Sequence, residues 1–315
     1  MIKEINLIKD FINKNIKNIS VDELTSLENN GYVLLRRNKY FWKNYGIDID
    51  VLKDRCEELI NIEGENAGKD GKTKTSTAAE EGAYRLTNLL AKGDCFKNLF
   101  TVPDILCCTH RVLGDNFRLS SMDMRDPLKG MGHQGLHLDW GQRKSINDTF
   151  YQCSAFIMLD KVTINNGPLR VIPKSHQNLV DVKSSSAHSH KRTIEDNKSL
   201  DWLDRNESKL VTGNIGDIII LNSNTFHGGT NNISGDRRRV IFINYRNINL
   251  RTQLDQFDYI PKVLHENFSD FEKKILFLYP KPIYEKLKRL IYNYRDYKFI
   301  SLLIKTYSLI NKYIS

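Results

Sequence analysis

The sequence predicts a mainly β core, either a sandwich or a barrel, with helices before and after it. From about residue 116 to 250 the chain consists of short runs rich in β-branched and aromatic residues, separated by Gly, Asn, Pro and Ser clusters. Short strands spaced by turns are typical of sandwiches and barrels. The runs are NFRLSSMDMR, TFYQCSAFIMLD, PLRVIP, GDIIILNS and RRVIFINYR. Helical patterns on both sides of them make the expected fold class α+β.

The residues before this region predict helices. Isoleucines at helical spacing indicate a helix over 3–17. Ser20, followed three residues later by Glu23, is the pattern of a capping box and predicts a second helix over roughly 21–29, which ends at Gly31. Further expected elements are a strand at YVLLRR, helices at 48–63 and 102–114, and a polar loop at 66–82.

The excess of positive charge lies mainly in the last segment of the chain. Of the net charge of +9, six units come from residues 270–315, where ten Lys and Arg outnumber four acids. A basic tail on a nearly neutral remainder does not indicate a nucleic-acid-binding protein. We therefore expect no nucleic acid among the partners.

The five cysteines predict a reduced intracellular protein. Their number is odd, their spacing is irregular, and no C-x-x-C pair occurs. The charged, amphipathic start MIKEINLIKDFINK lacks the apolar centre of a secretory signal, and no apolar run is long enough to span a membrane. The sequence therefore favours a cytoplasmic location.

A polar insertion and a basic tail accompany the core. Residues 177–212 are polar and are expected to form a lid or insertion within a main domain that covers 1–265. Residues 266–315 are expected to form a basic, amphipathic helical tail. Two interpretations of the tail stay open. Residues 281–315 could lie on an anionic membrane, peripheral to its inner face, or pack as helices on the core or on a second copy.

The stretch HQGLHLDWG, residues 133–141, contains the candidate metal ligands. On a helix His133 and His137 would share a face, as in zinc peptidases, whereas on an extended segment His137 and Asp139 would share one. Glycines in and beside the stretch disfavour a helix. Gln134 stands where a zinc peptidase needs a glutamate base. The sequence therefore favours the pair His137 and Asp139, with His133 as a neighbour.

A third ligand and a cationic clamp follow later in the chain. Ninety residues after His137, His227 comes directly after an apolar run, in NTFHGG. Two imidazoles and one carboxylate on one face of Fe(II) leave three positions for a bidentate 2-oxo acid and O2. The distal carboxylate of 2-oxoglutarate needs a cation, and arginine offers a bidentate fork. Arg238 opens the next predicted strand, and alternation places Arg237 and Arg239 on the opposite face.

These motifs occur in a recognisable order. They are His137-x-Asp139, NNGPLRVIPKSH (165–176), GDIIILNSNTFHGG (216–229) and the spaced Asn232, Ser234 and Arg238. In this order they resemble the phytanoyl-CoA dioxygenase family of Fe(II)/2-oxoglutarate oxygenases over roughly residues 22–247. The resemblance implies a double-stranded β-helix, a jelly-roll barrel of the cupin type, with its core near 115–250. It also implies Fe(II) as the metal, with 2-oxoglutarate and O2 as co-substrates.

The resemblance implies roles for individual residues. His137, Asp139 and His227 are expected to be the iron ligands, and Arg238 is expected to bind 2-oxoglutarate. The family often has a serine two residues after the second histidine, where this chain has Gly229. The co-substrate pocket is therefore expected to include Thr230, together with Ser120 or Ser121 and Phe156. Candidate substrate contacts are Trp140, Arg118, Arg125 and His133.

The expected function is hydroxylation of an unactivated C–H bond, with release of succinate and CO2. The substrate would be a small molecule, or a lipid- or carrier-linked and possibly glycan-related one. Desaturation, epimerisation and ring closure can follow the same hydrogen abstraction, and the sequence leaves them open. The alternative is a non-catalytic jelly-roll binding protein whose basic tail engages a membrane or a partner. The oligomeric state also stays open.

Overall fold

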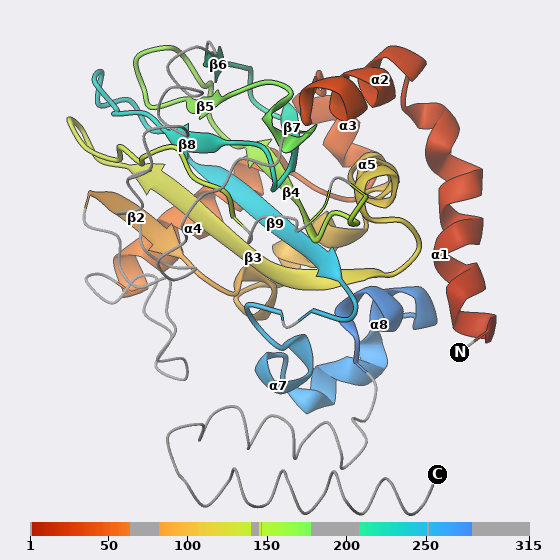
Figure 1. Cartoon of the computed structure of the whole chain (residues 1–315). Coiled ribbons are helices and arrows are strands. Elements are labelled where there is room, and N and C mark those ends of the chain that lie inside the picture. Colours follow the sequence, from red (N-terminus) through yellow and green to blue (C-terminus); the bar gives the residue numbers. More distant parts are fainter. Residues whose placement is uncertain are drawn as a thin grey trace, which may run out of the picture. The chain divides into compact units, whose positions relative to one another are not determined.

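Two antiparallel β-sheets form the centre of this computed structural model (Figure 1). The large sheet has the strand order β1-β7-β4-β9-β3-β2, and the small sheet has the order β6-β5-β8. Each of these pairings is antiparallel. The strands are β1 (Tyr32–Leu35), β2 (Ala83–Leu86), β3 (Phe117–Pro127), β4 (Gln152–Met158), β5 (Leu169–Val171), β6 (Lys209–Val211), β7 (Ile218–Asn222), β8 (His227–Gly229) and β9 (Val240–Asn247).

The described part of the chain comprises residues 2–63, 82–139, 145, 147–177, 208–250 and 252–278. Most of the predicted lid at 177–212 lies outside the described residues, as do Trp140 and the tail from residue 279 onward. The first compact unit of the chain extends to Phe277 and so includes the α-helices Gln256–Tyr259 and Asp270–Leu276, which follow the last strand. A separate tail domain stays a prediction.

Apolar side chains from both sheets pack against one another. Along β9, Val240 and Phe242 lie on the face toward the small sheet, because side chains alternate between the faces of a strand. Residues opposite them on β3 and β4 share this inner face. The buried inter-sheet cluster consists of Met158, Val162, Val171, Val211, Ile219, Leu221 and Val240. The apolar runs recognised in the sequence therefore build one core between two sheets.

Helices cover the outer face of the large sheet. α5 contacts β4, β7 and β9, while α4 contacts β2 (Figure 1). The outward-facing Ile241, Ile243 and Tyr245 are fully buried as a result. The α-helices are α1 (Ile2–Asn15), α2 (Val21–Asn30), α3 (Lys39–Lys43), α4 (Ile49–Glu63), α5 (Pro103–Leu113), α7 (Gln256–Tyr259) and α8 (Asp270–Leu276). Short 3-10 helices occur at Ile16–Asn18, Leu89–Ala91, Asp94–Phe96, Leu99–Thr101, Ser175–Gln177 and Lys262–Asn267.

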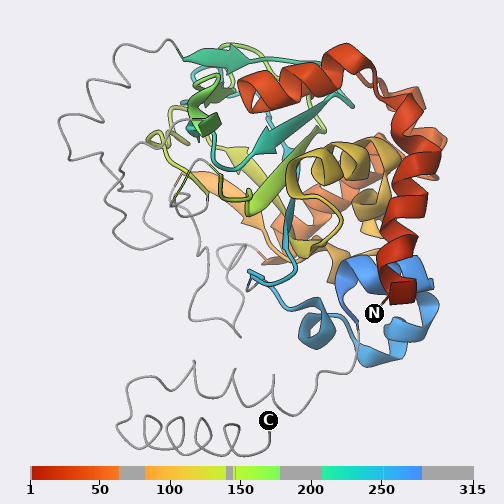
Figure 2. The same cartoon turned by 45° about the vertical axis from the view of Figure 1, so that its right-hand side comes forward.

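The N-terminal helices agree with the sequence pattern. The Ser20 hydroxyl accepts a hydrogen bond from the Glu23 N–H at 3.1 Å, and the Glu23 carboxylate accepts one from the Ser20 N–H at 2.9 Å. The capping box is thus confirmed. Gly31 ends α2 with φ of 78°, a left-handed conformation that favours glycine. α1 contacts α5 and α8 (Figure 2), with the rings of Phe11 and Phe271 stacked at 4.4 Å.

The arginine cluster precedes β9 instead of lying within it. β9 begins at Val240, and the backbone N–H groups of Arg238 and Arg239 donate to the carboxylates of Asp126 and Asp160, at 2.8 and 2.9 Å. Carboxylate oxygens therefore take the place of a neighbouring strand as acceptors. This explains why the predicted strand RRVIFINYR is shorter in the structure.

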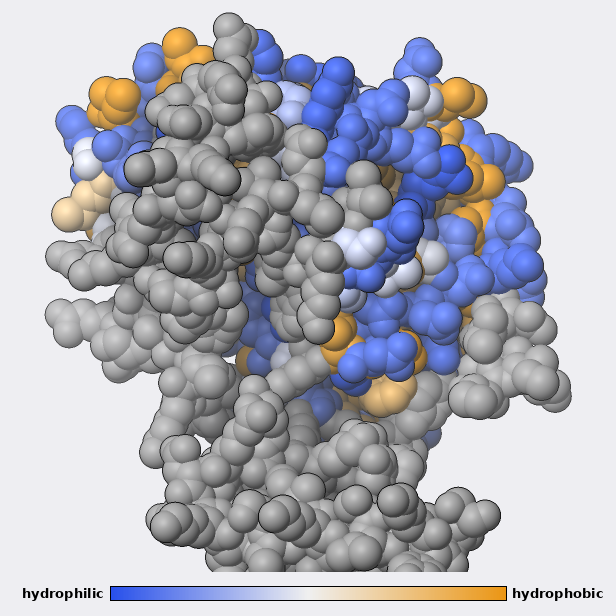
Figure 3. Space-filling model, in the orientation of Figure 1, coloured by the Kyte–Doolittle hydropathy of each residue, from blue (hydrophilic) through white to orange (hydrophobic). Residues whose placement is uncertain are grey.

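The described surface on the face shown in Figure 3 is mostly hydrophilic, with scattered apolar side chains. The most exposed apolar residues, Val263 at 80% and Val21 at 78%, belong to different elements. Within the described residues, no helix has the length and apolar character needed to cross a membrane.

Candidate metal centre and co-substrate pocket

The structure brings His137, Asp139 and His227 together. Their ligand atoms all lie within 4.8 Å of one another. The Nε2 atoms of both histidines are 3.5 Å from Oδ1 of Asp139, and the two imidazole centroids are 4.5 Å apart. His133, by contrast, is exposed and lies outside this cluster.

The backbone explains why the three side chains converge. His137 and His227 form an isolated antiparallel bridge, in which each N–H donates to the other carbonyl, at 2.9 and 3.1 Å. Residues paired in this way place their side chains on the same face. Asp139 is two residues after His137 and shares that face, and its N–H donates to the Ser223 carbonyl at 3.3 Å. The H-x-D spacing is therefore that of an extended segment, as predicted.

Backbone carbonyls orient both imidazoles. Nδ1 of His137 lies 2.8 Å from the Gly135 carbonyl, and Nδ1 of His227 lies 2.9 Å from the Thr225 carbonyl. A carbonyl only accepts, so Nδ1 carries the proton in each ring and Nε2 presents its lone pair. This carbonyl partner is the usual way in which proteins hold a metal-binding histidine.

Asp139 and His227 shift each other's pKa. Burial raises the pKa of the Asp139 carboxyl, but His227 and His137 outweigh burial and hold that pKa well below its usual range. Burial lowers the pKa of His227, but the Asp139 carboxylate raises it above its usual value. The side chains of His137 and Asp139 are 21% and 29% exposed, so an ion can reach the cluster from that side.

The donor set fits a divalent transition-metal ion. Two neutral imidazole nitrogens and one carboxylate form the ligand set of mononuclear non-haem iron sites, and they leave coordination positions open. Some catalytic zinc sites use the same donors. The three residues alone therefore establish a candidate metal centre, and the choice of metal depends on what surrounds it.

Three buried arginines lie on the inner face of the large sheet near one end of β9. Arg85 and Arg125 are direct partners across β2 and β3, and Arg125 is in turn opposite Val240 of the inter-sheet core. Arg85, Arg125 and Arg238 are 6%, 6% and 8% exposed. Asp123 is buried on the same face, and burial raises its pKa although Arg85 opposes that rise.

Carboxylates bind Arg237 and Arg239, the two neighbours of Arg238, while the Arg238 residue itself is buried. The Asp126 carboxylate accepts two hydrogen bonds, one from the Arg238 backbone N–H at 2.8 Å and one from Nε of Arg237 at 2.5 Å. Nε of Arg239 donates to Asp160 at 2.8 Å. As expected from strand alternation, the two flanking arginines pair with acids while Arg238 is buried.

The side chains of Arg125 and Gln134 lie close to Gly229. A Cβ atom at this position would lie 3.0 Å from Nη1 of Arg125 and 3.1 Å from Oε1 of Gln134. The Arg125 guanidinium therefore fills the space beside residue 229. Arg125 also donates to the Gly132 carbonyl at 2.7 Å. A cationic group thus lies beside Gly229, the position at which the family resemblance implied a serine hydroxyl.

The other predicted pocket residues differ in their surroundings. The Phe156 side chain lies on the inner face, with its ring 6.3 Å from that of Phe242. The Thr230 hydroxyl donates to the Pro168 carbonyl at 2.9 Å. Ser120 lies at a β-bulge and its hydroxyl accepts the Gln253 N–H at 2.8 Å, whereas Ser121 lies opposite Asn244 on the inner face. Their roles toward 2-oxoglutarate stay predictions.

Two of the predicted substrate residues lie on the inner face, and Arg246 joins them. Arg118 is half-buried at the end of β3 opposite Arg246, and its Nη2 donates to the Leu250 carbonyl at 2.7 Å. Arg125 belongs to the buried arginine group described above. Sequence reasoning did not single out Arg246. Its even spacing from Arg238 would have placed both arginines on one face of the predicted strand.

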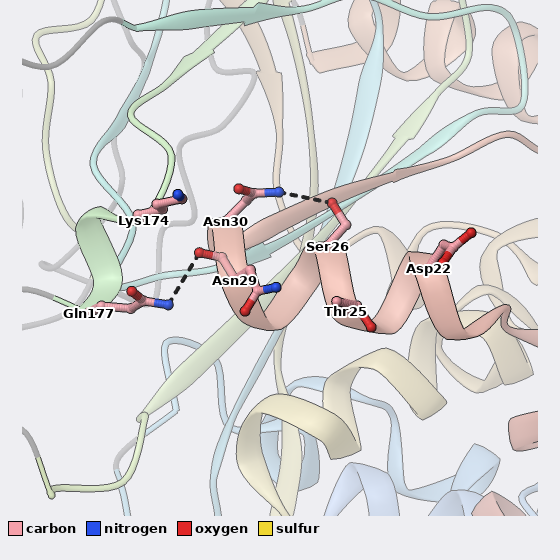
Figure 4. Close-up of a pocket in the computed structure, with 7 residues that line it drawn as sticks. All are labelled: Asp22, Thr25, Ser26, Asn29, Asn30, Lys174 and Gln177. Carbon is pink, nitrogen blue, oxygen red and sulfur yellow. Dashed lines mark hydrogen bonds between the residues drawn. The ribbon is translucent and has the colours of Figure 1, made fainter.

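A separate polar cavity of about 490 Å³ lies beside α2 (Figure 4). Two hydrogen bonds join residues that line it. Nδ2 of Asn30 donates to the Ser26 hydroxyl, and Nε2 of Gln177 donates to the Asn29 carbonyl, both at 3.2 Å. None of the three candidate metal ligands lines it. The residues that line it are Asp22, Thr25, Ser26, Asn29, Asn30, Lys174 and Gln177.

One known protein is similar to this chain in sequence. A probable alpha-ketoglutarate-dependent hypophosphite dioxygenase of Stutzerimonas stutzeri is 29% identical over 154 residues, which are 48% of this chain and 53% of the relative. This chain therefore matches about half the length of that relative.

Two solved structures are similar in fold. One is the non-heme alpha ketoglutarate dependent carbocyclase SnoK from nogalamycin biosynthesis, with a TM-score of 0.57 at 18% identity over 73% of this chain and 85% of that one. The other is the epimerase SnoN in complex with Fe3+, alpha ketoglutarate and nogalamycin RO, with a TM-score of 0.55 at 14% identity over 72% and 82%.

The family match covers most of the chain. Residues 27–240 match the phytanoyl-CoA dioxygenase (PhyH) family, and this range includes the three candidate ligands and Arg238. The chain belongs to the phytanoyl-CoA dioxygenase family.

Proposed function

We propose that this protein is an Fe(II)- and 2-oxoglutarate-dependent dioxygenase that hydroxylates a C–H bond of a small-molecule or carrier-linked substrate. The observation that carries the proposal is the convergence of His137, Asp139 and His227, together with the buried Arg125 beside Gly229, two residues after His227. The family match and the two similar folds, both of them Fe- or 2-oxoglutarate-dependent enzymes by name, support it.

The metal would be held by Nε2 of both histidines and by the Asp139 carboxylate. When bound, iron and 2-oxoglutarate supply the oxidising chemistry, in which one oxygen atom of O2 enters succinate and the other enters the substrate as 2-oxoglutarate loses CO2. The carbonyls of Gly135 and Thr225 keep the imidazole protons on Nδ1. The ligand set therefore stays fixed in the tautomer that binds a metal.

The buried arginines would bind the distal carboxylate of 2-oxoglutarate. Arg238 is oriented by its backbone bond to Asp126, and Arg125 lies beside Gly229, two residues after a metal ligand. A carboxylate that leaves water needs a charged partner, and arginine supplies parallel N–H donors. Phe156 and Phe242 would exclude water from this pocket.

We further propose that the fold is a double-stranded β-helix. The two antiparallel sheets would be the two halves of a double-stranded β-helix, with the site in the mouth between them. The inter-sheet cluster supports this arrangement, because it draws on both sheets. The bridge between His137 and His227 extends the small sheet by one further segment.

For the substrate we propose a class of compounds and not one compound, and we also propose a location in the cell. Relatives act by name on hypophosphite or in nogalamycin biosynthesis, as a carbocyclase and an epimerase, so similar sites serve different outcomes. We propose a cytoplasmic location with peripheral membrane contact through the basic residues 281–315. Vesicle flotation of the full chain against a chain ending at Phe277 tests that contact, and equal flotation would contradict it.

The direct test of the proposed activity is succinate formation. Purified protein with Fe(II), 2-oxoglutarate and air should release succinate slowly without added substrate, and faster when a metabolite mixture contains the substrate. Asp139→Ala should abolish both rates, because it removes one of three ligands. If the wild-type protein forms no succinate under either condition, the proposed function is wrong.

A further inference from the structure

A row of polar side chains crosses the inner face of the large sheet. Ser154 of β4 and Ser121 of β3 are both direct partners of Asn244 on β9, and these three strands lie side by side (Figure 1). Ser154 is also opposite Leu221, a member of the inter-sheet cluster. The Ser223 hydroxyl, just after β7, lies 3.1 Å from that of Ser154. We call Ser223, Ser154, Asn244 and Ser121 the polar row.

Hydrogen bonds join the polar row in one direction. The Ser154 hydroxyl donates its only proton to Oδ1 of Asn244 at 2.7 Å. The Ser223 hydroxyl is therefore the donor to the Ser154 oxygen. Nδ2 of Asn244 donates to the Ser121 hydroxyl at 2.9 Å, and Ser121 donates onward to Oε1 of Gln253 at 3.3 Å. Each hydroxyl proton of the row thus has a defined acceptor.

The burial of the polar row indicates a positioning role and not a binding surface. Its three serines are fully buried, and Asn244 is 7% exposed. Two residues away on the same face of β9 and β4, the side chains are the aromatic ones of Phe242 and Phe156. Packing alone therefore does not require hydroxyl groups here. Buried polar side chains cost free energy unless they are hydrogen-bonded, and a fully bonded network fixes one arrangement.

The polar row ends at a turn, residues 222–225, that contacts two of the three candidate metal ligands. The Asp139 N–H donates to the Ser223 carbonyl at 3.3 Å. The Thr225 carbonyl accepts from Nδ1 of His227 at 2.9 Å. One turn therefore contacts the main chain of the carboxylate ligand and orients one of the two imidazoles.

This turn is anchored on two sides. On the side of α2, the Gly31 carbonyl accepts hydrogen bonds from the Asn222 N–H at 2.8 Å and from the Thr225 hydroxyl at 3.0 Å. On the side of the large sheet, the Ser223 N–H donates to a carbonyl of β4 at 3.1 Å, and the Ser223 hydroxyl donates to Ser154. The side-chain anchor of Ser223 is therefore the polar row.

We propose that the polar row positions Asp139 for metal binding, through the carbonyl of Ser223. The bond from the Asp139 N–H to that carbonyl is longer than the other bonds of the turn, so a displacement of Ser223 affects it first. A metal ligand must stay within about 0.5 Å of its productive position. The proposal rests on the proposed dioxygenase function, because it concerns the same metal centre.

The test measures Co(II) binding by the full-length protein. Co(II) takes the same donors as Fe(II), and its visible absorption depends on the geometry of the ligands. Ser154→Ala removes the hydroxyl that links Ser223 to Asn244. We expect it to change the absorption spectrum and to raise the Co(II) dissociation constant at least about fivefold, somewhat less than the loss of a direct partner of a ligand causes. Ser154→Thr keeps the hydroxyl and should restore wild-type binding.

Cys153→Ala is the matched control. Cys153 is adjacent to Ser154 on β4 and fully buried, but it points to the opposite face, where its partner is Tyr245. Each of the two substitutions removes one buried atom from the same strand, so both should lower the stability of the protein. Cys153→Ala should nevertheless bind Co(II) within about twofold of the wild type, with an unchanged spectrum.

Ser223→Ala tests the same hydrogen bond from its other side. Either substitution breaks the single bond between the two hydroxyls. The double variant Ser154→Ala/Ser223→Ala should therefore bind Co(II) no more weakly than the weaker of the two single variants. Ser223→Ala also provides the comparison with Cys153→Ala if Ser154→Ala does not fold.

The wild type and the variants test different claims. A wild type that does not bind Co(II) contradicts both the positioning role and the proposed dioxygenase function. If the wild type binds Co(II) but the serine variants match Cys153→Ala in dissociation constant and spectrum, the positioning proposal is wrong while the dioxygenase function stands. Additive losses of affinity in the double variant would overturn the positioning proposal as well.

Discussion

His137 and His227 face each other through two reciprocal backbone hydrogen bonds, at 2.9 and 3.1 Å, with their Nε2 atoms directed at the same carboxylate. This pairing joins residues ninety positions apart in the sequence. Each imidazole is further fixed by a carbonyl acceptor at Nδ1. The candidate ligands are thus oriented by main-chain geometry, which substitutions at the surface leave unchanged.

Asp126 is predicted to position Arg238 for 2-oxoglutarate. Asp126→Asn replaces a charged acceptor of the Arg238 N–H and of Arg237 Nε with a neutral one. Weakening a charge-assisted bond by about 1.5 kcal/mol should raise the KM for 2-oxoglutarate about tenfold, with a smaller effect on kcat. Steady-state kinetics with varied 2-oxoglutarate measure both.

Glu57→Gln is the matched control for that prediction. The Glu57 carboxylate accepts hydrogen bonds from Arg237 and Arg239 on the exposed side of the cluster. Its KM for 2-oxoglutarate should equal that of the wild type. Equal increases in the two variants would mean that Asp126 acts only through general stability of the cluster.

Gly31 is predicted to be essential for the position of Thr225, whose carbonyl orients the His227 imidazole. A Cβ at Gly31 would lie 2.2 Å from the Thr225 hydroxyl oxygen, and φ is +78°. That hydroxyl donates to the Gly31 carbonyl at 3.0 Å, and the Thr225 carbonyl holds the His227 ring. Gly31→Ala should therefore lower the free energy of unfolding by more than about 2 kcal/mol and weaken metal binding.

Gly130→Ala separates backbone strain from this clash. Gly130 has φ of +74°, but a Cβ there would meet nothing within 4 Å. It should cost only the strain of the left-handed conformation, about 1–2 kcal/mol. Urea unfolding of both variants gives the comparison, and equal losses of stability would contradict the packing argument.

Asp160 is predicted to stabilise the fold in a pH-dependent way. Burial raises its pKa, but hydrogen bonds from Arg239 outweigh burial and lower it. Because the folded-state pKa lies below the unfolded value of about 3.9, the contribution is complete above about pH 4 and is lost as the pH falls through the folded-state pKa. The stability difference between wild type and Asp160→Asn should therefore shrink on acidification.

Denaturant unfolding at pH 7 and at pH 3 measures this difference. At pH 7 we expect Asp160→Asn to be less stable by about 1.5–3 kcal/mol, the range for a hydrogen bond to a charged group. A difference that is the same at both pH values would show that the Asp160 charge does not contribute.

The sequence predicted which candidate ligands lie together better than it predicted which residues surround them. His137 and Asp139 are close in sequence, and the glycines around them indicated an extended segment, so their shared face followed from alternation alone. The capping box at Ser20 was equally local. The role of Arg125 beside Gly229 depends on strands that are far apart in sequence, and no spacing rule shows which side chain fills that space.

Arg246 illustrates a different limit. Its position on the same face as Arg238 follows from the strand pattern, but its place opposite Gln152 depends on the pairing of β9 with β4. The order of strands in a sheet is not encoded in a local pattern. Trp140 and the predicted lid lie outside the described residues and stay predictions.

The central claim is that one Fe(II) and one 2-oxoglutarate bind together at His137, Asp139 and His227. The most direct measurement is an anaerobic titration that follows the visible charge-transfer band of the iron–2-oxoglutarate complex. We predict saturation at one equivalent of each per chain in the wild type, and no band in Asp139→Ala at the same concentrations. A wild type without the band, or an Asp139→Ala variant with the same band and midpoint, would contradict the account.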